Sequence, residues 1–292
     1  MRAFAIFVAL LAGALLVAAN LAYPAWLLVS TLADEPIHRI MHRIAMLAAL
    51  IGLVFLWRHY GLANKPSLGF DLRRAQFLRQ LLLGIAIGVG IILPLIVVLL
   101  VLDVRQPRAD VGILLIAKLA AGGLLSGLAI ALIEETFFRG ALFTAVRRES
   151  GTVLAVVLPS LLYASLHFLG GRLNLPADEI QWSSGFAVLG KMFLKYTEPM
   201  AIVDSFLALF CVGVVLAMAR IRTGAIAVSM GMHAAWVSTI VVTRGISTVA
   251  AESSTAWLVG SYDGVLGWGA LAYIAVLGAG YLVAARGLRL EA

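Results

Sequence analysis

Long apolar runs alternate with short polar connections along the whole chain, and this pattern predicts a bundle of helices. Most runs hold roughly 20 residues or more, which is the length that a helix needs to cross a bilayer. Main-chain polar groups inside a bilayer must be satisfied within their own segment, so we expect each run to be helical. We count eight runs, at residues 3–32, 41–57, 78–102, 112–146, 152–170, 201–219, 224–243 and 265–285.

The connections between these runs add three expectations. The longest one, from Gly171 to Met200, mixes apolar residues with lysines, which predicts a helix lying at the membrane interface between the fifth and sixth spans. The tightest one, at Ser150-Gly151, predicts a hairpin of the fourth and fifth helices. Glycines at small-xxx-small spacing predict close packing between helices, and they are Gly84, Gly88, Gly90, Gly123 and Gly127.

The composition indicates that these helices lie in a lipid bilayer rather than in water. Of 292 residues, 62% are hydrophobic and only 13% are charged, whereas soluble domains are about 45–50% apolar and about 25% charged. The fold class expected is therefore an all-α, polytopic membrane protein with about eight transmembrane helices. The net charge of +7 comes from basic residues placed singly or in pairs beside apolar runs. That placement indicates contact with membrane lipid, and we expect no nucleic-acid partner.

We divide the chain into three parts. Residues 1–111 hold the first three helices, residues 112–245 form a core of helices four to seven, and residues 246–292 hold the last helix. Lys and Arg are somewhat more numerous in the connections on the N-terminal side. The positive-inside rule then predicts that both termini are cytoplasmic, in the inner (plasma) membrane of the cell.

The stretch "ALIEETFFRGALF", from Ala131 to Phe143, places three ionisable groups inside an apolar run. Each such group costs about 2.5–3.5 kcal/mol on insertion scales, so ionisable side chains inside a membrane are functional candidates. Glu135 and Arg139 are four residues apart and share one helix face, which predicts a buried ion pair. Glu134 is turned about 100° away from that face and needs a partner from another helix.

Two histidines lie where they can meet Glu134. His167 follows Glu134 by 33 residues, with the Ser150-Gly151 turn midway. An antiparallel hairpin therefore brings both to the same height, roughly 25 Å from the turn. His233 lies about 15 Å into the seventh helix, which begins on the same side of the membrane as that turn. We predict that one carboxylate and two imidazoles converge inside the membrane.

Hydrolysis is the chemistry that suits this set. A carboxylate beside a neutral imidazole can take a proton from a bound water, and a second imidazole can donate to the oxyanion of a tetrahedral intermediate. Alternatively, a glutamate and two histidines could hold Zn²⁺. Two non-hydrolytic readings are a structural ion cluster and a proton-coupled transporter. The chain has no inverted repeat of the kind common in transporters.

The same residues resemble a family. An EExxxR motif beginning at Glu134, an aromatic residue four positions before His167, and His233 after a small-residue stretch resemble the CPBP family. These are intramembrane proteases of the CAAX prenyl protease 2 type, including bacteriocin-processing and immunity-related members. The resemblance covers roughly Ile116 to Thr243 and implies an intramembrane endopeptidase acting on membrane-associated or lipidated proteins or peptides.

The resemblance also implies a role for each of these motif residues. Glu134 and His167 would activate the attacking water, Glu135 and Arg139 would form a structural ion pair, and His233 would belong to the oxyanion hole. Members of the family are similar to glutamate proteases that need no metal, so no cofactor is expected.

Two positions depart from the family pattern. Tyr163 stands where Phe is usual, and Val237 stands where an HxxxN motif has Asn. Loss of one oxyanion donor typically costs about 10²–10³ in rate, and the neighbouring Trp236 and Ser238 are not on the matching helix face. The alternative reading is therefore a non-catalytic membrane scaffold or immunity protein of the same fold.

Overall fold

The computed structural model describes residues 1–290 of the chain, and the side chains of residues 1–279. The predicted all-α fold is confirmed, because long helices form at each of the eight apolar runs. Their ends agree with the predicted ends to within about five residues, apart from the two runs that meet at Ser150-Gly151. The long helices are α1 (Arg2–Val29), α2 (Ile37–His59), α4 (Arg74–Val101), α5 (Ile113–Glu135), α6 (Phe143–Leu166), α8 (Val203–Thr223), α9 (Ala227–Ile246) and α10 (Trp268–Leu290).

Short elements fill the connections. Helix α7 (Ser184–Met192) is the helix expected between the fifth and sixth apolar runs. Strands β1 (Arg105–Pro107) and β2 (Ser247–Val249) form a small antiparallel ribbon that no sequence pattern predicted. The remaining pieces are helix α3 (Lys65–Leu68) and 3₁₀ turns at Ala177–Glu179, Leu194–Thr197, Pro199–Ala201 and Ala256–Leu258.

Within the described part of the chain, five helical segments are long and apolar enough to cross a membrane, fewer than the eight predicted. One of them is the continuous run Ile113–Leu166, which contains both arms of the predicted hairpin. Gly151 breaks this run with φ +83°, a left-handed conformation that favours glycine. The other four are α1, α2, α4 and α8. The protein is thus a polytopic membrane protein.

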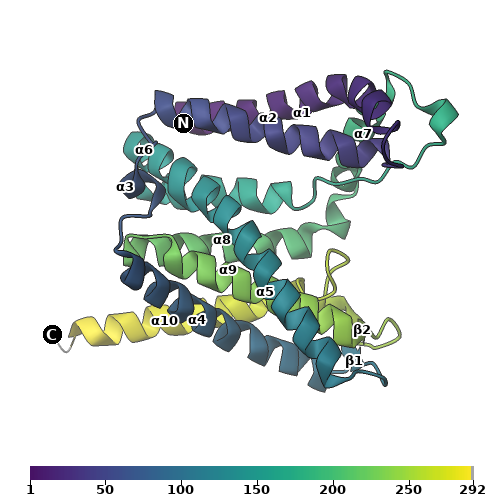
Figure 1. The fold of residues 1–292 in the computed structure, drawn as a ribbon. Helices are drawn as coiled ribbons and strands as arrows, with labels where there is room; N and C mark the ends of the chain where they lie inside the picture. The colour runs from purple at the N-terminus through teal and green to yellow at the C-terminus, as the bar shows by residue number, and fades with distance from the viewer. Residues whose placement is uncertain (291–292) are drawn as a thin grey trace.

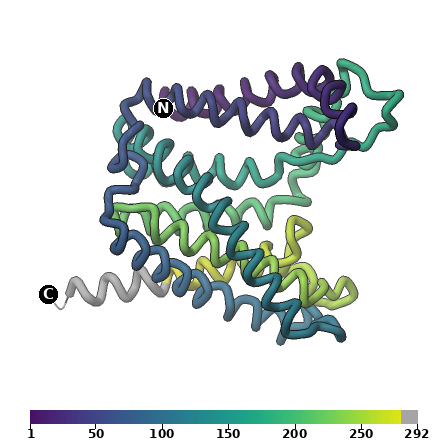
Figure 2. Tube along the Cα trace, viewed as in Figure 1, coloured from purple at the N-terminus to yellow at the C-terminus, as the bar shows by residue number. Residues whose placement is uncertain are grey.

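The connections gather at the two ends of the bundle. In Figure 1, α3 and the start of α6 lie at the left end, whereas the β1–β2 ribbon and the connection that contains α7 lie at the right end. Helices α1 and α2 pack together at one edge, as the trace in Figure 2 also shows. Helix α9 lies inside the bundle and packs against α4, α5 and α8.

Glycines fix the position of α9. A Cβ on Gly88 of α4 would lie 2.8 Å from the Cβ of Ala235, and one on Gly127 of α5 would lie 2.7 Å from the carbonyl oxygen of Ala234. Such contacts are too short for a side chain, so both neighbouring helices approach the α9 backbone closely. Of the glycines predicted to serve this purpose, Gly90 instead faces open space. These close contacts hold helix α9, which carries His233, between α4 and α5.

Candidate functional site

A buried ion pair begins the site. Arg139 Nη1 donates to Glu135 Oε1 at 2.9 Å, and neither residue is more than 1% exposed. Arg139 lies on a π-helical turn, Thr136–Leu142, that joins α5 to α6. Its second amino group donates to the carbonyl oxygen of Gly213 on α8 at 3.1 Å. Pi-helical turns occur frequently at functional sites, and this one anchors α5 to α8.

Glu135 also binds His233. The Nδ1 atom of His233 lies 3.0 Å from Glu135 Oε1. A carboxylate at this site accepts hydrogen bonds, so the imidazole donates from Nδ1. The Nε2 atom of a neutral His233 then has a lone pair and no proton. That atom lies 3.9 Å from Glu134 Oε2.

His167 is oriented in the same way from α6. Its Nδ1 lies 2.7 Å from the carbonyl oxygen of Tyr163, which can only accept, so Nδ1 carries the proton. A neutral His167 therefore has an unprotonated Nε2. The Tyr163 ring lies beside both imidazoles, with centroid distances of 4.3 Å to His167 and 6.0 Å to His233.

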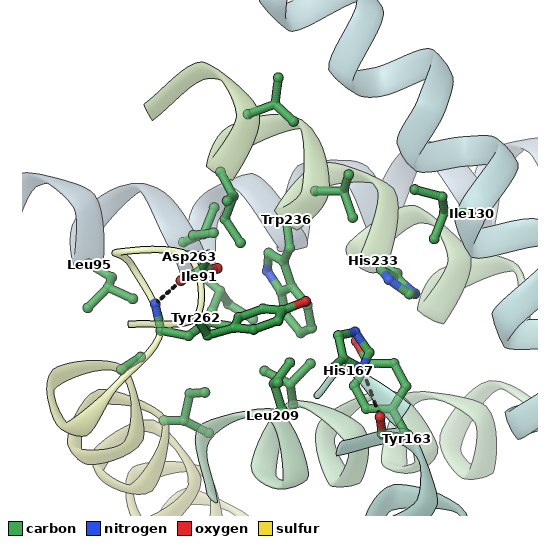
Figure 3. A pocket seen from close by; sticks show the side chains of 18 of the residues that line it. Ile91, Leu95, Ile130, Tyr163, His167, Leu209, His233, Trp236, Tyr262 and Asp263 are labelled. Atoms are coloured by element: carbon green, nitrogen blue, oxygen red, sulfur yellow. Dashed lines mark hydrogen bonds between the residues drawn. The ribbon is translucent and has the colours of Figure 1, made fainter. Parts of the chain in front are cut away.

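One cavity joins these groups. Glu134, His167 and His233 line a cavity of about 560 Å³, here called the central cavity. Figure 3 shows His167 and His233 on facing helices, with Tyr163 below them. The Oε2 atom of Glu134 is buried and takes no hydrogen bond from another described residue. Glu134 and His167, which the hairpin argument placed at one height, thus share a cavity with His233.

The rest of the central cavity is mostly apolar and comes from α4, α8, α9 and α10. Beyond the residues selected from the sequence, it also contains Tyr262 and Asp263 from the connection before α10, and Arg244 from the last turn of α9. Sequence reasoning missed Tyr262 and Asp263 because they lie outside the predicted core, residues 112–245. The available signal was a tyrosine and an aspartate within "GSYDG".

The motif that begins at His233 has an apolar residue at the position where the family pattern has Asn. Val237 lines the central cavity four residues after His233 and provides no donor. Trp236 Nε1 donates to the carbonyl oxygen of Gly88 at 3.0 Å, and the hydroxyl of Ser238 donates to that of Ala120 at 3.1 Å. Both neighbours of Val237 are therefore committed to helix packing and do not replace the missing amide.

Zinc is the alternative to a water bound by side chains alone. Among the described residues, no group of three or more His, Cys, Asp or Glu side chains is arranged to hold a metal ion. In the central cavity, the Nδ1 atoms of both histidines have acceptors, namely Glu135 and the carbonyl oxygen of Tyr163, which leaves their Nε2 atoms to bind either a water or a metal. The expectation that no metal is needed therefore stays a prediction.

Comparison with protein families identifies the central segment. Residues 116–239 match the family described as type II CAAX prenyl endopeptidase Rce1-like. The match covers less than half of the chain, so this segment, here called the Rce1-like segment, is similar to that family. Neither a curated protein nor a solved structure matches the chain.

The Rce1-like segment contains Glu134, Glu135, Arg139, His167 and His233. What this match supports, at the level of the family, is an intramembrane CAAX-type endopeptidase. The Rce1-like segment ends before Tyr262, so the central cavity is completed by a part of the chain that the family match does not include.

Proposed function

We propose that the protein hydrolyses a peptide bond inside the membrane with a water activated by Glu134 and His167. The observation that carries this proposal is the convergence of Glu134, His167 and His233 on the central cavity. The buried Oε2 of Glu134 is an acceptor without a partner among the described residues, so it is available to a water. The unprotonated Nε2 of a neutral His167 provides a second acceptor for that water.

The reaction follows from these acceptors. Glu134 accepts one proton of the water while His167 Nε2 accepts a hydrogen bond from the other O–H group. The water oxygen bonds to the carbonyl carbon, and the π electrons move to the carbonyl oxygen. The tetrahedral intermediate then collapses, the C–N bond breaks, and the departing amine takes the proton from Glu134. His233 donates from Nε2 to the oxyanion in its protonated form.

The lining of the central cavity suits a substrate that enters from the membrane. Its wall is built largely from aliphatic side chains, including Ile91, Leu95, Leu209 and Leu266. Cavities of this size and polarity bind mainly apolar ligands, which a few polar groups orient. We propose a lipidated or otherwise membrane-associated peptide as the substrate, in line with the prenyl endopeptidase description of the family.

A fluorogenic peptide with a prenylated CAAX terminus tests the activity. Purified protein in detergent cleaves it, and Glu134→Gln and His167→Ala each lower kcat by about 10²–10⁴, the range expected for general acid–base groups. Glu198→Gln and His59→Ala change the same residue types at exposed positions and leave kcat unchanged. Wild-type rates in both cavity variants would contradict the assigned roles.

Metal dependence is tested in the same assay. We expect no loss of cleavage in a chelator and no gain on adding zinc, because the acceptors that bind water are side chains of the protein. Zinc-dependent recovery after chelation would contradict this mechanism. If the wild-type protein cleaves no such peptide, the non-catalytic alternative that Val237 favours replaces the enzyme.

We also propose that both termini are cytoplasmic, from the excess of Lys and Arg on the N-terminal side. The central cavity then opens towards the opposite face, since Tyr262 and Asp263 lie in the connection between α9 and α10. In a Cys211→Ser background, a cysteine at Ser150 should resist a membrane-impermeant maleimide in intact cells, and one at Thr255 should react. The reverse pattern would overturn the orientation.

A further inference from the structure

The central cavity contains few groups that can donate to an oxyanion. Neutral His167 and His233 both carry their proton on Nδ1, which faces Tyr163 and Glu135 rather than the central cavity. Val237, one turn after His233, is apolar. A donor that does not depend on the protonation of an imidazole must come from another side chain.

Other potential donors in the cavity wall are already used or distant. Trp236 Nε1 donates to the carbonyl oxygen of Gly88, and the Tyr273 hydroxyl donates to that of Ile91 at 2.9 Å. Arg244 follows His233 by 11 residues, which places it about 16 Å further along α9. The hydroxyls of Tyr163 and Tyr262 remain, and neither forms a hydrogen bond to another described residue.

The two tyrosines differ in how accessible their side chains are. Tyr163 is 2% exposed, and its ring is covered by the two imidazoles and by the Arg139 guanidinium, 4.7 Å from the ring centroid. Tyr262 is only partly buried. Figure 3 shows its ring extending across the central cavity from the connection before α10, with the hydroxyl on the side that faces the two histidines.

We propose that the Tyr262 hydroxyl donates a hydrogen bond to the substrate oxyanion and takes the place of the donor that Val237 lacks. This inference rests on the proposed hydrolysis and assigns a catalytic residue outside the Rce1-like segment. In the intermediate, the negative oxygen accepts the O–H of Tyr262, and no proton is transferred. The hydrogen bond forms only when charge develops on that oxygen, so it lowers the barrier rather than the free energy of the bound substrate.

Contacts hold the phenol in this position. Its ring lies 5.9 Å from the His167 ring and 5.4 Å from the Phe168 ring, centroid to centroid. The next residue, Asp263, fixes the loop by accepting from the backbone amides of Val265 and Leu266 at 2.9 and 2.8 Å. A donor that is held before the reaction costs no reorganisation when charge develops.

The electrostatic surroundings keep this hydroxyl protonated. Burial raises the pKa of Tyr262 to about 12, and the carboxylates of Asp263 and Glu134 act in the same direction. The phenol therefore remains a donor throughout the physiological pH range. Tyr262 and Glu134 line the same cavity.

Kinetics of Tyr262→Phe on the prenylated fluorogenic peptide test the inference. We expect kcat to fall by about 10²–10³, the cost of one oxyanion donor, with KM unchanged. Tyr23→Phe, in a separate cluster around α1 and α7, is the matched control and keeps wild-type kcat. Adding Val237→Asn to Tyr262→Phe should restore part of the lost kcat, because the amide then lies one turn after His233.

A binding measurement decides the inference even where turnover is slow. A peptide phosphonate mimics the tetrahedral oxyanion, so Tyr262→Phe should weaken its binding about 10²-fold or more and leave the parent peptide unaffected. Equal kcat in Tyr262→Phe and wild type, or a change confined to KM, would overturn the role of Tyr262 and leave the proposed function intact. A larger loss in Tyr163→Phe would assign the donor to that residue instead. A wild-type protein that neither cleaves the peptide nor prefers the phosphonate would overturn the proposed function itself.

Discussion

At the scale of single residues, Glu135 links the buried Arg139 to His233. One of its oxygens accepts from both Arg139 and His233. The pair with Arg139 follows from four-residue spacing and was predictable from the sequence. The bond to His233 was not, because it joins residues 98 positions apart and depends on the rotation of α9. Glu135 is thus a positioning residue for His233 as well as the counterion of a buried arginine.

Removal of this carboxylate separates its two roles. Glu135→Leu leaves Arg139 buried without a counterion and should destabilise the folded state by about 3–5 kcal/mol. Glu135→Leu combined with Arg139→Met should recover much of that stability, measured by thermal denaturation in detergent. It should not recover kcat, because His233 has lost its Nδ1 acceptor. Full recovery of kcat in the double variant would show that Glu135 does not position His233.

At the scale of helices, the sequence predicted what depends on local pattern. Apolar runs predicted the long helices, and small-residue spacing predicted close packing at Gly88 and Gly127. The π-helical turn and the β1–β2 ribbon were not predicted. The π-helical turn differs from an α-helix only in the partners of a few hydrogen bonds, which a pattern of apolar residues does not reveal. The ribbon pairs two three-residue strands that lie far apart in the chain. The loop that carries Tyr262 has no periodicity, so its approach to His167 depends on tertiary packing.

Two glycines of α4 provide a matched test of helix packing. A Cβ at Gly88 would meet Met232 Cα at 2.9 Å, whereas one at Gly90 meets nothing within 4 Å. Gly88→Ala should therefore force α4 away from α9, cost about 1–3 kcal/mol and lower kcat by displacing His233. Gly90→Ala should be neutral or stabilise the helix by up to about 1 kcal/mol. Equal melting temperatures for the two variants would contradict this account of the packing.

At the scale of the whole molecule, the bundle brings together residues that the chain keeps far apart. Glu134 lies on α5, His167 follows α6, and His233 lies on α9, yet all three line the central cavity. The turn at Gly151 folds α6 back, and the close contacts of α9 with α4 and α5 set the depth of His233. The wall of this cavity is largely apolar, which suits the proposed meeting of a membrane-associated peptide and a water there.

The most direct test of this account is a double-mutant cycle on kcat with Glu134→Gln and His167→Ala. If both side chains bind one shared water, each single variant removes nearly all of its activation. The double variant should then be little slower than either single one. Losses that multiply in the double variant would mean that the two residues act independently, and would contradict the claim that they activate the same water.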